Sequence, residues 1–113
     1  MGAARRGISL EAVTRSHLFI RVRPGRRDEL IRALDRLELL TAVRHQPGFL
    51  AAEIQVPAEG DDHLLVWSAW ASPEHHERWL SSSDYEQMLR ETDELRADMP
   101  DVHVYRVVDA VQS

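Results

Sequence analysis

The order in which strand-like and helix-like segments alternate restricts the fold of this chain more than any other feature. Four short segments are rich in β-branched and aromatic residues and are flanked by turn-forming residues, a pattern typical of strands. They span residues 17–23, 49–56, 63–70 and 102–108. Between the first two, apolar residues recur every three or four positions from residue 26 to about residue 44, which predicts one long amphipathic helix.

A second helical region lies between the third and fourth strands. Ser72 followed by Pro73 is a typical helix start, because a hydroxyl caps the first turn and the missing N–H of proline is not needed there. That helix is expected to run to residue 80, where three serines interrupt it. Ser83 and Glu86 have the spacing of a capping box, which predicts a further helix from Ser83 to about Asp98.

The resulting order, β-α-β-β-α-β, predicts an α+β fold of the ferredoxin-like type, with a four-stranded antiparallel sheet and helices on one face. We expect this domain to span residues 17–110 and to follow a tail of residues 1–16. The strands carry apolar residues on both faces, as residues 64–67 illustrate. Because the helices can cover only one face, we expect a second copy of the chain to cover the other, giving a homodimer through the sheet faces.

Composition and charge remove several classes of function. The chain has no cysteine and no lysine, which excludes thiol nucleophiles, thiolate metal sites and Schiff-base chemistry and fits a reducing, cytoplasmic location. Residues 28–113 hold seven arginines against 18 acidic residues, a net charge of −11, and the third strand lacks the basic residues of an RNA-recognition module. We therefore expect no nucleic-acid partner. No apolar run approaches the ~20 residues that span a bilayer, and the N-terminal segment lacks the apolar core of a secretory leader, so no membrane association is expected.

Three short motifs between residues 46 and 83 occur in an order that is more specific than any of them alone. They read Gln46-Pro47-Gly48-Phe49, Trp70-Ala71-Ser72-Pro73-Glu74 and Trp79-Leu80-Ser81-Ser82. With them, residues 17–110 resemble the antibiotic biosynthesis monooxygenase superfamily. The resemblance implies a dimeric α+β barrel with a pocket between the sheet and the helices of each subunit. Members include cofactor-independent oxygenases of aromatic polyketide biosynthesis and monooxygenases that degrade haem.

The resemblance also places individual residues. It puts Trp70 on the pocket face of its strand, whereas Trp67, three residues earlier, points to the opposite face and toward the second copy. The haem-degrading branch needs an Asn on the first strand and a haem-ligating His further on, and these positions hold Leu18 and Leu89 here. The resemblance therefore favours an enzyme without an organic cofactor, and it leaves haem, with His76 as the ligand, as an alternative.

Five residues around this pocket make the candidate site. His76 is the expected catalytic base, because histidine titrates near neutral pH. Adjacent helix residues point about 100° apart, so at most one of His75 and His76 faces inward, and His76 is the preferred one. Trp70, Trp79 and Met88 are expected to hold a flat aromatic substrate, and Tyr85 to hydrogen-bond one of its oxygens. A second interpretation stays open, in which the tryptophans are core residues and the histidines are solvated.

Other polar clusters are weaker candidates. The Asp61-Asp62-His63 run fits a hairpin turn better than a metal site, and the serines at 81–83 lack the nucleophile elbow of a hydrolase. We therefore expect no metal and no serine nucleophile. Four polar strand residues form a cluster on the dimer face, or else His17 or His103 reaches the pocket; the four are His17, Arg21, His103 and Tyr105.

Three functions remain. The first is a cofactor-independent monooxygenase that combines an aromatic, polyketide-type or quinone-type molecule with O₂, in which the protein supplies a base, a dry pocket and stabilisation of an anionic substrate. The second is a haem-binding or haem-degrading monooxygenase. The third is a non-catalytic, ligand-binding dimer whose pocket holds no proton-transfer group, so the position of His76 distinguishes it from the first.

Overall fold

The computed structural model describes residues 13–111, which form one antiparallel sheet and four helices. In chain order the elements are β1 (Thr14–Arg21), α1 (Arg27–Arg36), α2 (Leu39–Arg44), β2 (Phe49–Gln55), β3 (His63–Trp70), α3 (Pro73–Leu80), α4 (Ser83–Glu91) and β4 (Asp101–Arg106). The strands lie in the order β2-β3-β1-β4. This arrangement confirms the α+β, ferredoxin-like fold that the sequence predicts.

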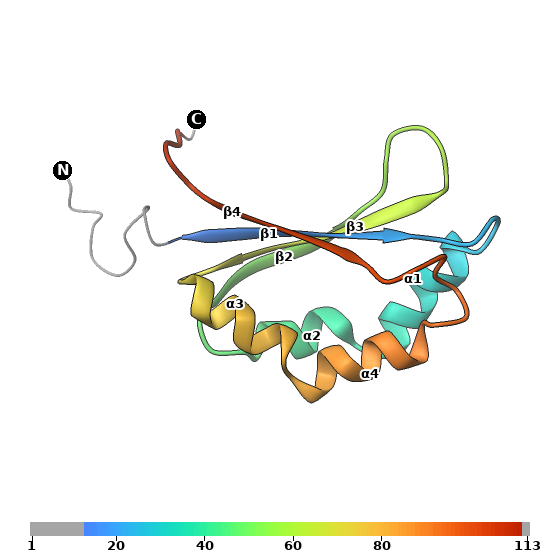
Figure 1. Cartoon of the computed structure of the whole chain (residues 1–113), viewed down its shortest axis with the longest axis horizontal. Helices are drawn as coiled ribbons and strands as arrows, with labels where there is room; N and C mark the ends of the chain where they lie inside the picture. Colours follow the sequence, from blue (N-terminus) through green and yellow to red (C-terminus); the bar gives the residue numbers. More distant parts are fainter. Residues whose placement is uncertain (1–12, 112–113) are drawn as a thin grey trace.

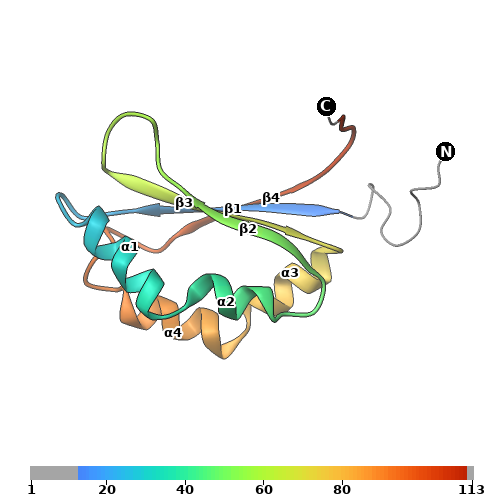
Figure 2. The same cartoon turned by 180° about the vertical axis from the view of Figure 1, so that it is seen from behind.

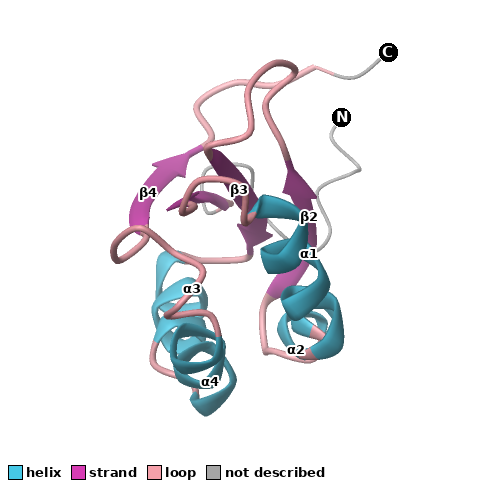
Figure 3. Ribbon diagram, turned by 90° about the vertical axis from the view of Figure 1, so that its right-hand side faces the viewer, coloured by secondary structure: helices cyan, strands magenta, loops and turns pink. Residues whose placement is uncertain are grey.

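All the helices cover the same face of the sheet (Figures 1 and 2). An end-on view shows them as two columns, α1 and α2 on the β2 side and α3 and α4 on the β4 side (Figure 3). The hydrophobic core fills the space between sheet and helices, with Trp70, Ile20 and Leu30 among its largest fully buried side chains. The opposite face of the sheet, called the open face below, carries no helix from residues 13–111.

The first helical region consists of two helices, and the prediction of one long helix is wrong. Glu38, between them, adopts a left-handed backbone conformation with φ of 53°, which is uncommon for a residue with a Cβ. In an unbroken helix, Thr41 would lie on the same buried face as Leu34, because residues seven positions apart share a helix face. The break instead turns Leu39 and Val43 toward the sheet, where both are buried. The break therefore accompanies the burial of Leu39 and Val43, with one residue in an uncommon backbone conformation.

The second helical region is interrupted at the serines, as predicted, but the cap of α4 is Ser82 and not Ser83. The Ser82 backbone is extended, and its Oγ accepts a hydrogen bond from the Tyr85 backbone N–H at 3.2 Å. Because α3 closes at Ser81, Ser82 is the residue left to link the two helices. Ser72 caps α3 as expected, and its Oγ also accepts from a first-turn N–H.

α4 ends at Glu91, well before the predicted end near residue 98. The cause is Arg96, a buried arginine that folds back on the helix. Its guanidinium donates to the Leu89 carbonyl at 2.7 Å and to Thr92 Oγ1 at 3.1 Å. An arginine that binds the last carbonyls of a helix satisfies the groups that a further turn would otherwise pair. The chain then turns back toward β4.

Several strand ends differ from the prediction, among them the start of β1 and the end of β4. β1 begins at Thr14 and not at His17, so residues 14–16 belong to the sheet and not to a tail. Thr14 pairs with Trp70 of β3 and with Arg106 of β4, and this two-sided pairing extends the ladder beyond the apolar run. β4 ends at Arg106, before the predicted end at Val108, because Arg106 is the last residue that has a partner on β1.

Side chains of β1 and β3 alternate between the two faces of the sheet. Those beneath the helices are buried, and they are Thr14, Ser16, Leu18, Ile20, Leu64, Val66, Ser68 and Trp70. Those on the open face are mostly half-buried or exposed, and they include His17, Phe19, His63, Leu65 and Trp67. The predicted assignment of Trp67 and Trp70 to opposite faces is therefore confirmed.

Candidate functional site

A small cavity lies between the sheet and the two columns of helices. Its volume is about 10 Å³, which is room for about one water molecule. The walls come from β1, β2, β3, α2, α3 and α4: Leu18, Leu39, Val43, Ala52, Val66, Ser68, Trp79, Tyr85 and Met88.

The cavity coincides with a row of small side chains across the sheet. On the helix side, Ala52 of β2 lies beside Ser68 of β3, which lies beside Ser16 of β1. The neighbouring rows carry larger residues, such as Trp70 on one side and Val66 on the other. Because these small side chains do not extend as far as the helices, space remains between the sheet and the helices at this row.

Three of the five predicted site residues line the cavity: Trp79, Tyr85 and Met88. The rings of Trp79 and Tyr85 meet edge to face, with centroids 5.7 Å apart, and Met88 follows Tyr85 on the same face of α4. Burial raises the pKa of Tyr85, although the charge of Arg96 opposes the shift. The Tyr85 hydroxyl is therefore protonated at neutral pH and can donate a hydrogen bond.

Trp70 is completely buried, at 0% exposure, and is not among the residues that line the cavity. Its ring packs edge-on against Phe49 at 5.8 Å and tilted against His76 at 5.9 Å. Its indole Nε1 donates a hydrogen bond to Ser68 Oγ at 2.9 Å. Trp70 is thus connected to the cavity through Ser68 and not through its own ring face.

The two consecutive histidines have different surroundings. His76 faces inward, is 3% exposed, and packs against Trp70 without lining the cavity. Burial lowers its pKa, so the ring is neutral at neutral pH. His75 faces Ser72, with Nδ1 and Oγ 2.8 Å apart. The His75 ring also lies where a Cβ on Gly48, which has φ of +79°, would collide with it.

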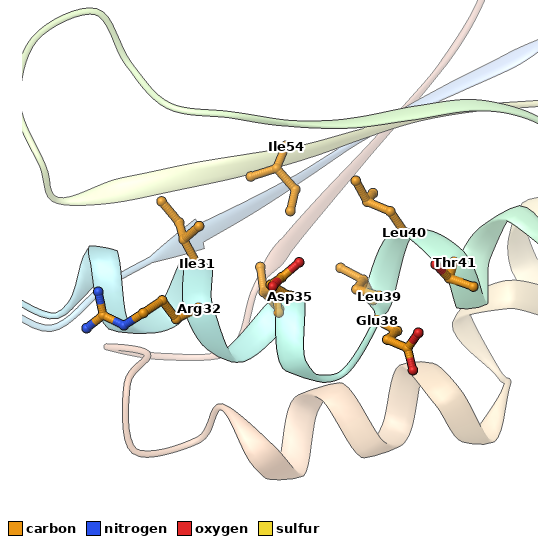
Figure 4. Close-up of a pocket in the computed structure, with 9 residues that line it drawn as sticks. Ile31, Arg32, Asp35, Glu38, Leu39, Leu40, Thr41 and Ile54 are labelled. Carbon is orange, nitrogen blue, oxygen red and sulfur yellow. The ribbon is translucent and has the colours of Figure 1, made fainter.

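A larger groove opens where the break between α1 and α2 faces β2 (Figure 4). It encloses about 440 Å³, a volume within the range of small-molecule sites. Ile54 points from β2 toward the helices, and charged side chains stand on the rim (Figure 4). The lining residues are Ile31, Arg32, Leu34, Asp35, Glu38, Leu39, Leu40, Thr41 and Ile54. The sequence does not predict this groove, because the groove depends on the helix break at Glu38, where the chain has no Gly or Pro.

Leu39 separates the groove from the cavity, since it lines both. It is the first residue of α2 and follows the left-handed Glu38. Its side chain is therefore shared by the walls of the two hollows.

The four polar strand residues that the sequence left between the dimer face and the pocket lie on the open face and do not line the cavity. His17 of β1 pairs with Trp67 on one side and with His103 on the other. Its ring meets that of Tyr105 edge to face at 5.7 Å. Arg21 forms ion pairs with Asp98 and Asp101 at the end of this face.

The predicted turn of Asp61, Asp62 and His63 holds a local contact. Asp62 Oδ1 lies 2.8 Å from His63 Nδ1, and this hydrogen bond lowers the pKa of the carboxyl group. Within residues 13–111, no group of three or more His, Cys, Asp or Glu is arranged to hold a metal ion. Among the helices of the same range, none has both the length and the hydropathy to cross a bilayer.

Fold and site together define a class of protein: a small α+β domain that encloses an aromatic-lined cavity between a sheet and its helices, next to a ligand-sized groove. The family comparison specifies the class further. The model of the antibiotic biosynthesis monooxygenase family matches residues 15–91, so the chain belongs to that family.

Solved structures with the same fold come from several organisms. A protein from Bordetella bronchiseptica, provisionally assigned as an antibiotic biosynthesis monooxygenase, is 18% identical with a TM-score of 0.73, covering 86% of this chain and 98% of its own. A protein from Mycobacterium tuberculosis is 20% identical with a TM-score of 0.75, covering 89% of this chain and 100% of its own. A provisionally assigned antibiotic biosynthesis monooxygenase from Chloroflexus aurantiacus is 23% identical with a TM-score of 0.68, covering 89% and 98%. At these identities the likeness shows the fold. No curated protein matches the chain.

Proposed function

We propose that this protein is a cofactor-independent monooxygenase that oxidises an aromatic, polyketide-type or quinone-type small molecule. The observation that carries the proposal is the composition of the cavity wall, where Trp79, Met88 and the hydroxyl-bearing Tyr85 come together beneath the helices. Ligand sites of this kind combine apolar and aromatic walls with a few placed polar groups. Membership of the antibiotic biosynthesis monooxygenase family adds support.

The substrate needs more room than the cavity provides in this conformation. A flat aromatic molecule is far larger than about 10 Å³, whereas the neighbouring groove holds about 440 Å³. We therefore expect the substrate to displace Leu39 and to occupy groove and cavity together. Its ring would then contact Trp79 and Met88, through aromatic and sulfur–aromatic contacts, and the protonated Tyr85 would donate to one of its oxygens.

The proposed reaction converts a methylene group between two aryl rings into a carbonyl group. Removal of a proton gives a delocalised carbanion, which is electron-rich enough to react with O₂ directly. One oxygen atom becomes the new carbonyl and the other leaves as water. The four electrons that the carbon loses are the four that O₂ gains, so the step needs no external reductant.

His76 is the proposed base for this deprotonation. Its lowered pKa keeps the ring neutral at pH 7 and therefore able to accept a proton. It lies against Trp70 and does not line the cavity, so proton transfer requires a relaying water or a movement of the Trp70 side chain. This distance from the cavity favours a second candidate function, a ligand-binding protein without catalysis.

Haem fits the described residues poorly. The two positions that hold Asn and His in the haem-degrading branch are occupied by Leu18, which lines the cavity, and Leu89, which packs against the core. Within residues 13–111, neither the cavity nor the groove is lined by a histidine. We therefore assign no step of the reaction to haem.

We further propose that the protein works as a homodimer with the open face at the interface. Trp67, Leu65 and Phe19 lie on that face and are only partly buried. The edge strand β4 is exposed along its whole length. Its open-face residue Tyr105, which pairs with Arg15 of β1, is 57% exposed. Aromatic and apolar side chains on an uncovered sheet face favour association with another chain.

The test is O₂ consumption by purified protein supplied with anthrone, followed with an oxygen electrode and by mass spectrometry of the product. We expect uptake above the spontaneous rate and one atom of isotopically labelled O₂ in the anthraquinone formed. Met88→Trp, which fills the cavity, should abolish the excess uptake. If neither anthrone nor a hydroquinone gives excess uptake although both bind, the protein is the non-catalytic binder. If neither binds, both candidate functions are wrong.

A further inference from the structure

We infer that Ser68 binds an oxygen atom of the aromatic ligand as a hydrogen-bond donor, and that Trp70 holds Ser68 in this role. The inference rests on the proposed function, because it concerns the ligand of the same pocket. Ser68 is then a binding residue and Trp70 a positioning residue, whereas the sequence predicts that Trp70 contacts the substrate ring and assigns no role to Ser68.

The first observation is where Ser68 lies. It belongs to the sheet wall of the cavity, in the row of small side chains between Ala52 and Ser16. The other cavity residues of the sheet are apolar: Leu18, Ala52 and Val66. A ligand that enters the cavity and contacts the sheet therefore meets one hydroxyl group in an otherwise apolar floor.

The second observation is the direction of the hydrogen bond between Ser68 and Trp70. An indole N–H can only donate, so Ser68 Oγ is the acceptor in this 2.9 Å contact. A serine hydroxyl also has one proton to donate. Within residues 13–111, the Ser68 hydroxyl accepts this one hydrogen bond and donates none. The Trp70 contact thus orients the hydroxyl as a donor with an unused proton beside the cavity.

The third observation is burial. Ser68 and Trp70 are both buried, at 6% and 0% exposure. Hydrogen bonds in series strengthen one another in a low-dielectric interior, so the indole contact makes the Ser68 hydroxyl a better donor. A buried donor of this kind favours a carbonyl oxygen and favours a phenolate oxygen more strongly, since charge-assisted hydrogen bonds are the stronger ones.

The position of Tyr85 narrows the class of ligand. It lines the helix wall of the same cavity, across from the sheet wall, and its raised pKa leaves it a second donor. Two donors on opposite walls suit a planar molecule that carries acceptor oxygens at opposite edges of one ring. A para-quinone or the corresponding hydroquinone anion has this arrangement.

The test compares two probes of the same shape, menadione, which has two para carbonyl groups, and methylnaphthalene, which has none. The chain has no cysteine or lysine side chain for the quinone to modify. For Ser68→Ala we expect menadione to bind about three- to tenfold more weakly, as for a lost hydrogen bond, and methylnaphthalene to bind as it does to the native protein. Equilibrium dialysis measures both affinities.

Ser16→Ala is the matched control, because Ser16 is a buried serine in the same row that is not among the residues lining the cavity. It should leave both affinities unchanged. Circular dichroism shows that each variant is folded, and methylnaphthalene binding shows that its pocket is intact. Native menadione affinity in Ser68→Ala, or an equal loss for both probes, would overturn the role of Ser68 while leaving the pocket in place. Failure of the native protein to bind either probe would overturn the proposed function and this inference together.

Discussion

The two faces of the sheet differ in how far the single chain buries their side chains. Beneath the helices, β1 and β3 present a continuous set of buried residues, interrupted by one row of small side chains that leaves the cavity. On the open face, the same strands present aromatic, charged and aliphatic side chains that are only partly covered. Under the proposed function, one face encloses a small molecule and the other meets a second copy of the chain.

The contrast also separates two kinds of aromatic residue. Trp70, on the helix side, is completely buried, with its N–H bonded to Ser68. Trp67, on the open face, is half-buried, and the Arg15 guanidinium lies 5.8 Å from the centre of its ring. The first tryptophan has all its partners within the chain, and the second is the one that a partner subunit would cover.

The largest effect is expected from Trp67→Asp, which places a charge in the proposed interface. Burying an unpaired carboxylate between two sheets is so unfavourable that the dimer should not form. Light scattering at micromolar concentration should then give the single-chain mass of 13.0 kDa or show aggregation. Leu40→Asp, on the helix side of the molecule, is the control that should keep the dimer mass. A dimer that survives Trp67→Asp would show that this residue is outside the interface.

A second effect should distinguish neighbouring residues of β3. Leu64 is completely buried beneath the helices, whereas Leu65 is on the open face. Leu64→Ala should lower the free energy of unfolding by about 2–5 kcal/mol, the usual cost of a buried leucine. Leu65→Ala should cost less in dilute solution, and its cost should grow with protein concentration because a second copy covers that position in the proposed dimer. Urea denaturation at two concentrations measures both, and equal costs would contradict the assignment of faces.

Trp70→Phe should have an intermediate effect. It removes part of a close-packed ring and leaves Ser68 without its indole partner, so we expect a loss of about 1–3 kcal/mol in the free energy of unfolding. Urea denaturation is again the measurement. A variant as stable as the native protein would show that Trp70 lies in loosely packed space, as the wall of an open pocket does.

The smallest effect concerns pH and the buried His76. Its pKa is lowered from an ordinary value of 6.5 by burial, so the unfolded chain binds a proton more readily than the folded protein does. Stability should therefore be fully present above pH 6.5 and should fall as the pH drops from there toward the lowered pKa. Thermal unfolding across this range should show the slope in the native protein and a weaker slope in His76→Phe. An unchanged slope would mean that His76 is hydrated in the folded state.

Much of the fold could be predicted from the sequence because hydrophobic period and capping residues are local signals. The alternation of β3 and the Ser72-Pro73 start of α3 are examples. The break at Glu38 could not, since it depends on which apolar residues the sheet accepts and not on a helix-breaking residue. The early end of α4 depends likewise on Arg96 reaching back to Leu89, a contact that no local pattern shows.

The candidate site could be predicted only in part. Helical spacing brings Tyr85 and Met88 to one face, which is why both were found. The hydrogen bond between Trp70 and Ser68 was not predicted, although the two side chains are neighbours on one face of β3. A serine two residues before a tryptophan in a strand does not by itself indicate that the two side chains bond. The groove was missed together with the helix break that forms it.

The central claim is that the helix-covered face binds the aromatic molecule, and a crystal structure of the protein with menadione tests it most directly. The ring should lie between sheet and helices, in contact with Trp79 and Met88, with Leu39 displaced and one carbonyl oxygen within hydrogen-bonding distance of Ser68 Oγ. Menadione bound on the open face against Trp67, with the cavity as small as it is here, would contradict the claim.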